Sequence, residues 1–201
     1  MLGNSKKIKK QTMNDNLLNQ ITPFIKLARY DRPVGFMLLF WPCMWSLLLY
    51  SLYIDQPVPI GFFVLFFIGS IIMRGAGCTW NDFLDKEYDK NVSRTKDRPL
   101  ASNKIKTINA LVFLLVQLLI GLLILVQFNK LTIIIGSLAL IPVFIYPLMK
   151  RVTWWPQIFL GITFNWGALL GWLSLSNDFS SIYPILPVSY THLRAHETHE
   201  H

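Results

Sequence analysis

The stretch Val34–Ile54, which reads VGFMLLFWPCMWSLLLYSLYI, contains no charged residue. The hydrocarbon core of a bilayer is about 30 Å thick, so a helix needs roughly 20 apolar residues to cross it. This stretch therefore predicts a membrane-spanning helix. Apolar and polar residues do not alternate along it, so the pattern does not favour a strand of an outer-membrane barrel.

Four further stretches have a similar character, at residues 59–80, 110–126, 131–149 and 157–175. Three of them are interrupted by a single notable polar or charged residue, namely Arg74, Gln117 and Asn165. The sequence thus predicts an all-α protein, a polytopic transmembrane helix bundle with five spans. No soluble element has to be assumed between them.

The composition excludes three other classes of protein. Hydrophobic residues make up 53% of the 201 residues and charged residues only 15%, whereas soluble domains carry about 25% charged residues. The 14 Phe and 7 Trp exclude an intrinsically disordered chain. The two cysteines, Cys43 and Cys78, lie in apolar stretches, which excludes a disulfide-stapled secreted fold.

The basic residues that give the net charge of +8 are distributed in step with the predicted spans. Lys and Arg gather before the first span, between the second and third, and between the fourth and fifth, while the loops near Asp55 and Asn129 contribute only Lys130. Because basic loops stay on the cytoplasmic side, this alternation predicts a cytoplasmic N-terminus. It also explains the charge without nucleic acid. We expect a bacterial inner membrane, since no Arg-rich transit peptide precedes the chain.

The two ends differ from the predicted bundle. Residues 1–16 are polar and predict a flexible cytoplasmic lead, and residues 17–28 have apolar side chains at helical spacing. That helix lies either along the membrane surface or against the spans. We expect the membrane domain to cover residues 17–187, with residues 182–187 as the stump of a sixth span. All four histidines fall in the last ten positions, and residues 188–201 are predicted to be a non-native tail.

Four oxygen-bearing side chains gather at the end of the second span: Asn81, Asp82, Asp85 and Asp89. If the helix continues through them, their spacing places all four on one face. Three carboxylates on one face repel one another unless they share a cation. Oxygen ligands of this kind suit Mg²⁺, which retains water and bridges to phosphates.

Basic residues flank these acids. Arg74 precedes them by two helical turns, and Lys96 and Arg98 follow in the next loop. Carboxylates that hold a metal beside Arg and Lys predict a site for a diphosphate. The alternative is a solvated membrane boundary, with Arg74 extending its side chain to the interface. No Walker A loop or dinucleotide fingerprint is present.

Three blocks carry a more specific pattern. They are DRPVG at residues 31–35 with LLFWPCMW at 38–45, MRGAGCTWND at 73–82 with RTKDRPL at 94–100, and YPLMKR at 146–151 with Pro156 and Gln157. Together they resemble the UbiA-type intramembrane aromatic prenyltransferases over about residues 17–187. The resemblance is greatest to the branch of that family that acts on 4-hydroxybenzoate.

The resemblance implies a reaction and a role for each motif residue. The reaction is transfer of a polyprenyl group from polyprenyl diphosphate to the ring of 4-hydroxybenzoate, in ubiquinone biosynthesis and within the lipid bilayer. Asn81, Asp82, Asp85 and Asp89 are expected to hold Mg²⁺, with Asp82, Asp85 and Arg74 as catalytic residues. Asn81, Lys96, Arg98, Tyr146 and Arg151 are expected to bind substrate, and Trp80 and Tyr146 to stabilise an allylic cation.

The chain also departs from the family pattern. The family has nine spans and a second aspartate-rich motif, and this sequence ends before that motif. We therefore expect the 201-residue chain to be an inactive front part of the enzyme. The rival functions are a prenyltransferase of the same superfamily with a naphthoate, homogentisate or haem acceptor, and a small channel or transporter. A channel would require polar residues in several spans, and only isolated ones occur.

Overall fold

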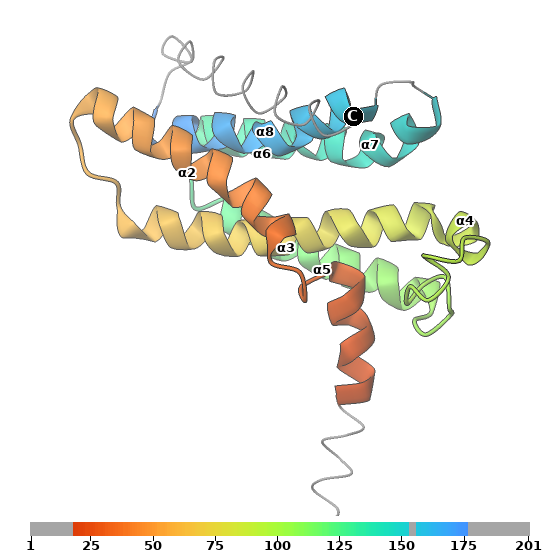
Figure 1. The fold of residues 1–201 in the computed structure, drawn as a ribbon. Helices are drawn as coiled ribbons and strands as arrows, with labels where there is room; N and C mark the ends of the chain where they lie inside the picture. Colours follow the sequence, from red (N-terminus) through yellow and green to blue (C-terminus); the bar gives the residue numbers. More distant parts are fainter. Residues whose placement is uncertain (1–17, 153–155, 177–201) are drawn as a thin grey trace, which may run out of the picture.

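The computed structural model describes residues 18–152 and 156–176, apart from the side chains of residues 150–158. Every regular element in these ranges is a helix (Figure 1). After a helix over residues 18–28, the elements are α2 (Val34–Ile54), α3 (Ile60–Leu84), α4 (Lys86–Lys90), α5 (Thr107–Leu125), α6 (Lys130–Leu138), α7 (Leu140–Val152) and α8 (Pro156–Leu175). The predicted all-α class is confirmed.

The predicted spans reappear with shifted boundaries. Within the described residues, four segments are long and apolar enough to cross a membrane: Val34–Ile54, Ile60–Leu84, Thr107–Leu125 and Lys130–Met149. The fifth apolar segment, Phe159–Leu175, is shorter. Helix α3 extends past the predicted end at Trp80 to Leu84. Asn81 and Asp82 therefore belong to the spanning helix itself, and not to the loop that follows it.

The fourth span is divided at Ala139 into α6 and α7. Pro142 has no backbone N–H, so the carbonyl of Leu138 cannot receive the usual helical hydrogen bond from that position. The proline instead occupies the first turn of α7, where its missing donor is tolerated. Helix α7 contacts α3 as well as α8, whereas α6 contacts α8 and α5.

The helices pack in two groups joined by α2. Helix α3 lies along α5, while α8 packs on α6 and α7, and α2 crosses between α8 and α3 (Figure 1). The tightest approach is a glycine seam, made by Leu39, Cys43 and Ser46 of α2 and by Gly167 and Gly171 of α8. A Cβ at Gly167 would lie 2.8 Å from Cys43 Sγ, and one at Gly171 would overlap the Cys43 carbonyl oxygen. Small residues therefore let these two backbones meet.

The predicted N-terminal helix is present over residues 18–28 and runs crosswise to the spans (Figure 1). Its first turns expose Leu18 and Ile21, whereas Leu27 is fully buried at its far end. Leu27 packs with Leu100, Ile105 and Ala110, so the end of this helix is fastened to the loop and to α5. The predicted lead (1–16), sixth-span stump (182–187) and tail (188–201) lie outside the described residues.

Candidate functional site

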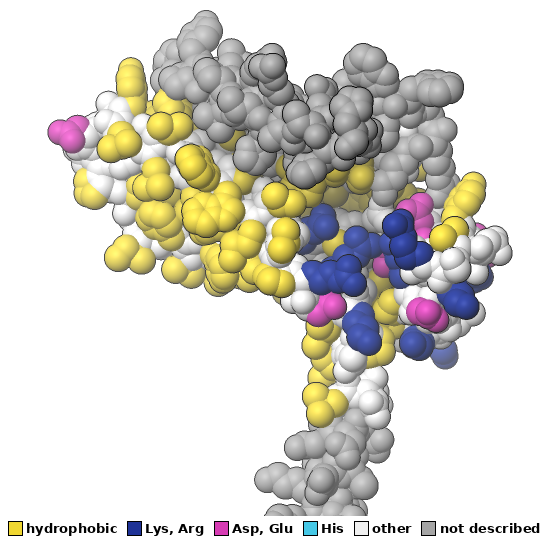
Figure 2. All heavy atoms as spheres, viewed as in Figure 1, with side chains coloured by type: hydrophobic (Ala, Val, Ile, Leu, Met, Phe, Trp, Pro, Cys, Tyr) yellow, Lys and Arg dark blue, Asp and Glu magenta, His cyan; other side chains and the backbone are white. Residues whose placement is uncertain are grey.

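Many of the charged residues in the described part of the chain gather at one end of the bundle, around the end of α3, α4 and the loop that follows. Figure 2 shows most of the Lys, Arg, Asp and Glu side chains of that view concentrated there, while apolar side chains predominate on the other described surface and an acidic side chain also lies at the opposite end. This distribution matches a bundle whose apolar sides face lipid and whose charged end faces water.

Asp82 is the centre of this charged end. It is only 2% exposed, and its Oδ1 atom accepts hydrogen bonds from Arg29 Nη2 at 2.9 Å and from Arg98 Nη1 at 3.1 Å. Arg98 Nη1 also donates to Asp89 Oδ2 at 2.7 Å. We call Arg29, Asp82, Asp89 and Arg98 the charged cluster. Two guanidinium groups and two carboxylates compensate one another in it, as buried charges require.

The helical register carries through the junction of α3 and α4. The Asp85 amide donates to the Asn81 carbonyl at 2.9 Å, and the Asp89 amide donates to the Asp85 carbonyl at 2.8 Å. The Asn81 side-chain amide also donates to Asp85 Oδ2 at 3.2 Å. Hydrogen bonds of the helical i to i−4 type thus continue from α3 into α4, although α3 itself ends with Asp85 as its C-cap residue.

The four predicted metal ligands divide into two pairs. Asp82 and Asp89 both accept hydrogen bonds from Arg98, while the Asn81 side-chain amide donates one to Asp85. Among the residues described, no three His, Cys, Asp or Glu side chains come together as a ready-made metal site. The donor chemistry, four oxygen-bearing side chains within three helical turns, suits Mg²⁺.

The loop between α4 and α5 positions Arg98. Thr95 Oγ1 donates to the Asp89 carbonyl at 3.3 Å, and Ser102 Oγ donates to the Arg98 carbonyl at 2.8 Å. Leu100 and Ile105 anchor the loop in the apolar cluster beneath it. Lys96, also predicted to bind substrate, is exposed to solvent on this loop.

Arg74 lies deeper in the bundle than the charged cluster. Eight residues of helix separate it from Asp82, a rise of about 12 Å. Its Cζ lies 5.8 Å from the centre of the Phe164 ring of α8, and its Nε is buried without a hydrogen-bond partner in the described part of the chain. A Cβ at Gly35 would lie 2.6 Å from that Nε, so α2 also presses against it.

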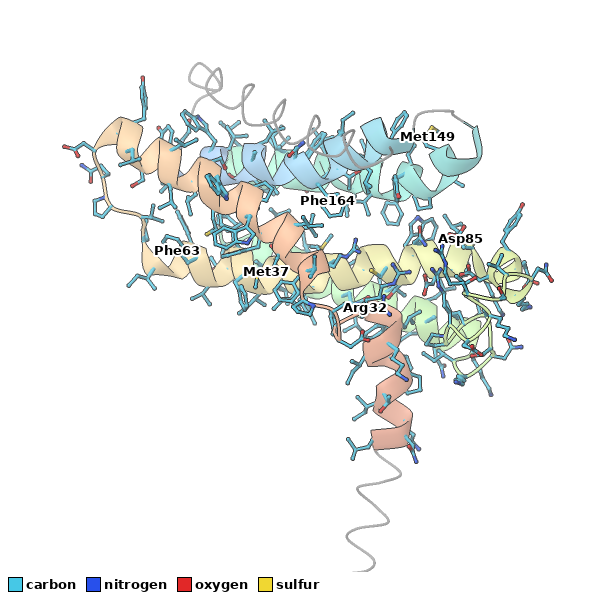
Figure 3. All side chains as sticks on the ribbon, in the orientation of Figure 1. Arg32, Met37, Phe63, Asp85, Met149 and Phe164 are labelled. Atoms are coloured by element: carbon cyan, nitrogen blue, oxygen red, sulfur yellow. The ribbon has the colours of Figure 1, made fainter. Side chains whose placement is uncertain are left out.

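Tyr146 is a half-buried residue of α7, the helix that packs against both α3 and α8. Helix α7 is held against α3 by Trp80, whose indole N–H donates to the Phe144 carbonyl at 3.3 Å. Figure 3 shows Asp85 at the α4 end of α3 and Phe164 on the overlying α8. Arg151, the remaining predicted substrate-binding residue, lies outside the described side chains.

Sequence reasoning missed Arg29 as a site residue and counted it only among the basic residues that set topology. The structure places it in the left-handed region, with φ of 56°, directly after the helix over residues 18–28. No motif in the sequence connects it to Asp82, which lies 53 positions away. Its nearness to the block at residues 31–35 was the available signal.

Two titrating groups lie near this end but outside the spans. Burial raises the pKa of the Tyr30 phenol, and a hydrogen bond from Gln117 acts in the opposite direction. Glu87 is exposed, and its bond to Lys90 at 2.8 Å lowers the pKa of its carboxyl group. The Glu87–Lys90 pair lies on the exposed face of α4, whereas Asp89 of the same helix is buried.

A sequence model described as the UbiA prenyltransferase family matches residues 39–197. The chain belongs to this family. It is 52% identical over 165 residues to "4-hydroxybenzoate polyprenyltransferase, mitochondrial" of Drosophila melanogaster, a match that covers 82% of this chain and 42% of the relative. Relatives with the same description are 47% identical in Arabidopsis thaliana and 44% identical in Homo sapiens. Those two matches also cover 82% of this chain, and 40% and 44% of the respective relatives.

The family fold is also found among solved structures. One structure, described as concerning "Digeranylgeranylglyceryl phosphate synthase in membranes", matches with a TM-score of 0.67 at 20% sequence identity. The match covers 87% of this chain and 58% of that chain. The UbiA chain described here thus has the fold of that protein and spans about two fifths of the length of its curated relatives.

Proposed function

We propose that this chain forms part of an enzyme that transfers a polyprenyl group from polyprenyl diphosphate to the ring of 4-hydroxybenzoate, in ubiquinone biosynthesis. The support comes from the curated relatives, which carry that activity in their names at 44–52% identity. The membrane-spanning helices support a substrate with a long apolar chain, because the bilayer solvates such a chain directly.

The observation that carries the proposal is the charged cluster. A diphosphate needs cationic partners, and Arg29 and Arg98 supply two guanidinium groups within 3.1 Å of one carboxylate oxygen. Guanidinium groups bind phosphate oxygens in the same planar geometry that they use for carboxylates. The cluster therefore offers a diphosphate both the cations and the acidic side chains of a metal-assisted site.

Magnesium is part of this proposal. Asn81, Asp82, Asp85 and Asp89 would hold it through their side-chain oxygens, with Asp82 and Asp89 released from Arg98. When bound, Mg²⁺ neutralises charge on the diphosphate as that group leaves. Both pairs, Asp82 with Asp89 and Asn81 with Asp85, would contribute side-chain oxygens to it.

The remaining predicted residues act at two depths. Arg98 and Lys96 balance the negative charge that grows on the departing diphosphate when the allylic C–O bond breaks. Arg74, which lies deeper, would also balance this charge, and Tyr146 would bind substrate and stabilise the allylic cation. A ring carbon of the acceptor attacks that cation and then loses its proton to the departed diphosphate. The apolar helices around them exclude water, which would otherwise capture the allylic cation. Arg151 keeps its sequence-based assignment as a substrate-binding residue.

We also propose that the charged end lies on the cytoplasmic side of the membrane, which is the side predicted for the N-terminus. The curated relatives named above are described as mitochondrial, so they give no support to the bacterial inner membrane expected from the sequence. Orientation is testable with single cysteines in a chain that lacks Cys43 and Cys78. A membrane-impermeant reagent applied outside should modify position 55 and spare position 90, and the reverse pattern would contradict the orientation.

The activity is testable in a chimera in which this chain replaces the matching part of the Drosophila melanogaster relative. Membranes that contain the chimera should form prenylated 4-hydroxybenzoate from polyprenyl diphosphate and Mg²⁺. Homogentisate, a naphthoate and haem serve as competing acceptors. Product from one of these instead of 4-hydroxybenzoate would move the protein to another branch of the family. No product from any acceptor, with the chimera correctly inserted, would contradict the proposed transferase activity.

A further inference from the structure

Gln117 is a polar residue in the middle of the spanning helix α5, and it is only 2% exposed. A buried amide at membrane depth needs internal partners, because lipid supplies none. Its Nε2 donates to the Tyr30 hydroxyl oxygen at 2.9 Å. Its Oε1 lies 3.3 Å from Thr79 Oγ1, which also lies 2.9 Å from the Gly75 carbonyl oxygen. We call Tyr30, Thr79 and Gln117 the polar clasp.

The polar clasp depends on a close approach at Gly75. A Cβ built there would overlap the Tyr30 hydroxyl and lie 2.5 Å from Gln117 Nε2. Gly77, two residues later on the same helix, has nothing within 4 Å of the same position. Helix α3 therefore has one glycine that makes room for the clasp and one that does not.

The clasp holds the residue next to Arg29. The helix over residues 18–28 ends with two bonds, from the Arg29 amide to the Lys26 carbonyl at 3.2 Å and from the Tyr30 amide to the Ile25 carbonyl at 3.1 Å. In this type of helix end, the residue in the position of Arg29 is usually glycine. Arginine adopts the left-handed conformation there at a cost, so something outside the helix must hold the backbone in place.

We propose that Tyr30 and Gln117, with the space left by Gly75, are positioning residues that fix Arg29 on Asp82. The hydrogen bond to Tyr30 fastens the chain to α5 and α3 immediately after Arg29. The strained backbone then directs the Arg29 guanidinium to Asp82 Oδ1, 2.9 Å away. This inference rests on the proposed function, because it assigns the clasp a purpose in binding a diphosphate at the charged cluster.

The first measurement tests the clasp without any ligand. The 201-residue chain is placed in lipid nanodiscs, and amide hydrogen exchange is followed at Tyr30 and Arg32. Gly75→Ala should speed exchange at both amides about tenfold, because the added methyl group displaces Tyr30. The matched variant Gly77→Ala should leave both rates within about twofold. Equal rates in the two variants would overturn the proposal.

The second measurement tests the link to the charged cluster, with pyrophosphate and Mg²⁺ as the probe. Gly75→Ala and Tyr30→Phe should each weaken binding about tenfold, since a hydrogen bond to a charged group is lost when Arg29 is misplaced. Gly77→Ala should bind as the unsubstituted chain does.

A double-substitution cycle distinguishes positioning from general stability. Arg29→Gly relieves the backbone strain and removes the guanidinium, so adding Gly75→Ala to it should cause no further loss of pyrophosphate binding. A further tenfold loss would show that Gly75→Ala acts elsewhere and would overturn the proposal. Failure of the unsubstituted chain to bind Mg²⁺ and pyrophosphate would count against the proposed function alone, because the exchange measurement decides the clasp without ligand.

Discussion

The charged cluster and the glycine seam lie in the same bundle but depend on different forces. The cluster joins residues from a turn, two helices and a loop through three ion pairs, the shortest at 2.7 Å. The seam joins α2 and α8 with no charge at all, through the absence of side chains at Gly167 and Gly171. Packing in the seam is set by shape, whereas the cluster is held by charge.

This difference indicates which region is built for rigidity and which for binding. In lipid, two apolar helices gain little from hydrophobic burial and associate through close backbone packing. Removing that packing affects the whole bundle. A cluster of opposite charges, in contrast, is where the proposed function places the diphosphate and its metal. Substitutions in the seam should therefore reduce folding, and substitutions in the cluster should reduce function.

The largest expected effect is from Gly171→Leu. The new side chain would overlap the Cys43 carbonyl and Ser46 Oγ, so α2 and α8 must separate, at a cost of about 3 kcal/mol. Thermal unfolding of the chain in detergent should show this loss. The matched variant Gly61→Leu, at a position with nothing within 4 Å, should stay within about 0.5 kcal/mol. Equal stability of the two variants would mean that the seam is not close-packed.

The next effect is on function and is measured in the chimera. Asp82→Asn keeps the shape of the side chain but removes the charge that pairs with Arg29 and Arg98. We expect turnover to fall about 100-fold, equivalent to about 2.7 kcal/mol, with membrane insertion unaffected. Glu87→Gln, on exposed α4, is the control and should leave turnover unchanged. Near-normal turnover of Asp82→Asn would make the cluster a solvated membrane boundary without a catalytic role.

The sequence predicted these two regions to different extents. Hydropathy located the spans, and the spacing of Asn81, Asp82, Asp85 and Asp89 located the polar end, because both signals are local. Arg98, one partner of Asp82, was among the predicted site residues, but Arg29, the other, was not predictable from spacing, since it reaches Asp82 through a left-handed turn that glycine usually occupies. The division of the fourth span was foreseeable from Pro142, and the small residues at 167 and 171 signalled a close helix contact but not its partner.

A smaller effect is expected from Asn129, which ties two helices through a single side chain. Its amide nitrogen lies within hydrogen-bond distance of the carbonyls of Leu173, Ser174 and Ser176 at the end of α8. Its side-chain oxygen accepts from the Thr132 amide at the start of α6, at 2.9 Å. Asn129→Ala should lower the free energy of unfolding by about 1–2 kcal/mol.

The control for Asn129 is Ser137→Ala, because the Ser137 hydroxyl bonds only within its own exposed helix face, to the Ile133 carbonyl. Ser137→Ala should lower the free energy of unfolding by less than about 0.5 kcal/mol. If both variants unfold at the same denaturant concentration, the Asn129 hydrogen bonds contribute nothing to the stability of the fold.

The smallest effect comes from an ion pair that lacks the burial of the charged cluster. Lys90 lowers the pKa of Glu87 below its ordinary value of 4.5, and both side chains are substantially exposed. Because the folded pKa is below the unfolded one, the pair stabilises the fold above the unfolded pKa. That contribution is lost as the pH falls through the folded pKa. Carboxyl NMR of the chain in micelles should therefore give a titration midpoint for Glu87 below 4.5. Lys90→Gln should raise it, and about 1 M salt should have a similar effect by screening the charges. A midpoint that is unchanged by both treatments would assign the pKa shift of Glu87 to another neighbour.

The same salt concentration should leave Arg29 paired with Asp82, since the carboxylate there is shielded from solvent. Exposure, and not ion-pair distance, thus separates a surface pair from a binding cluster.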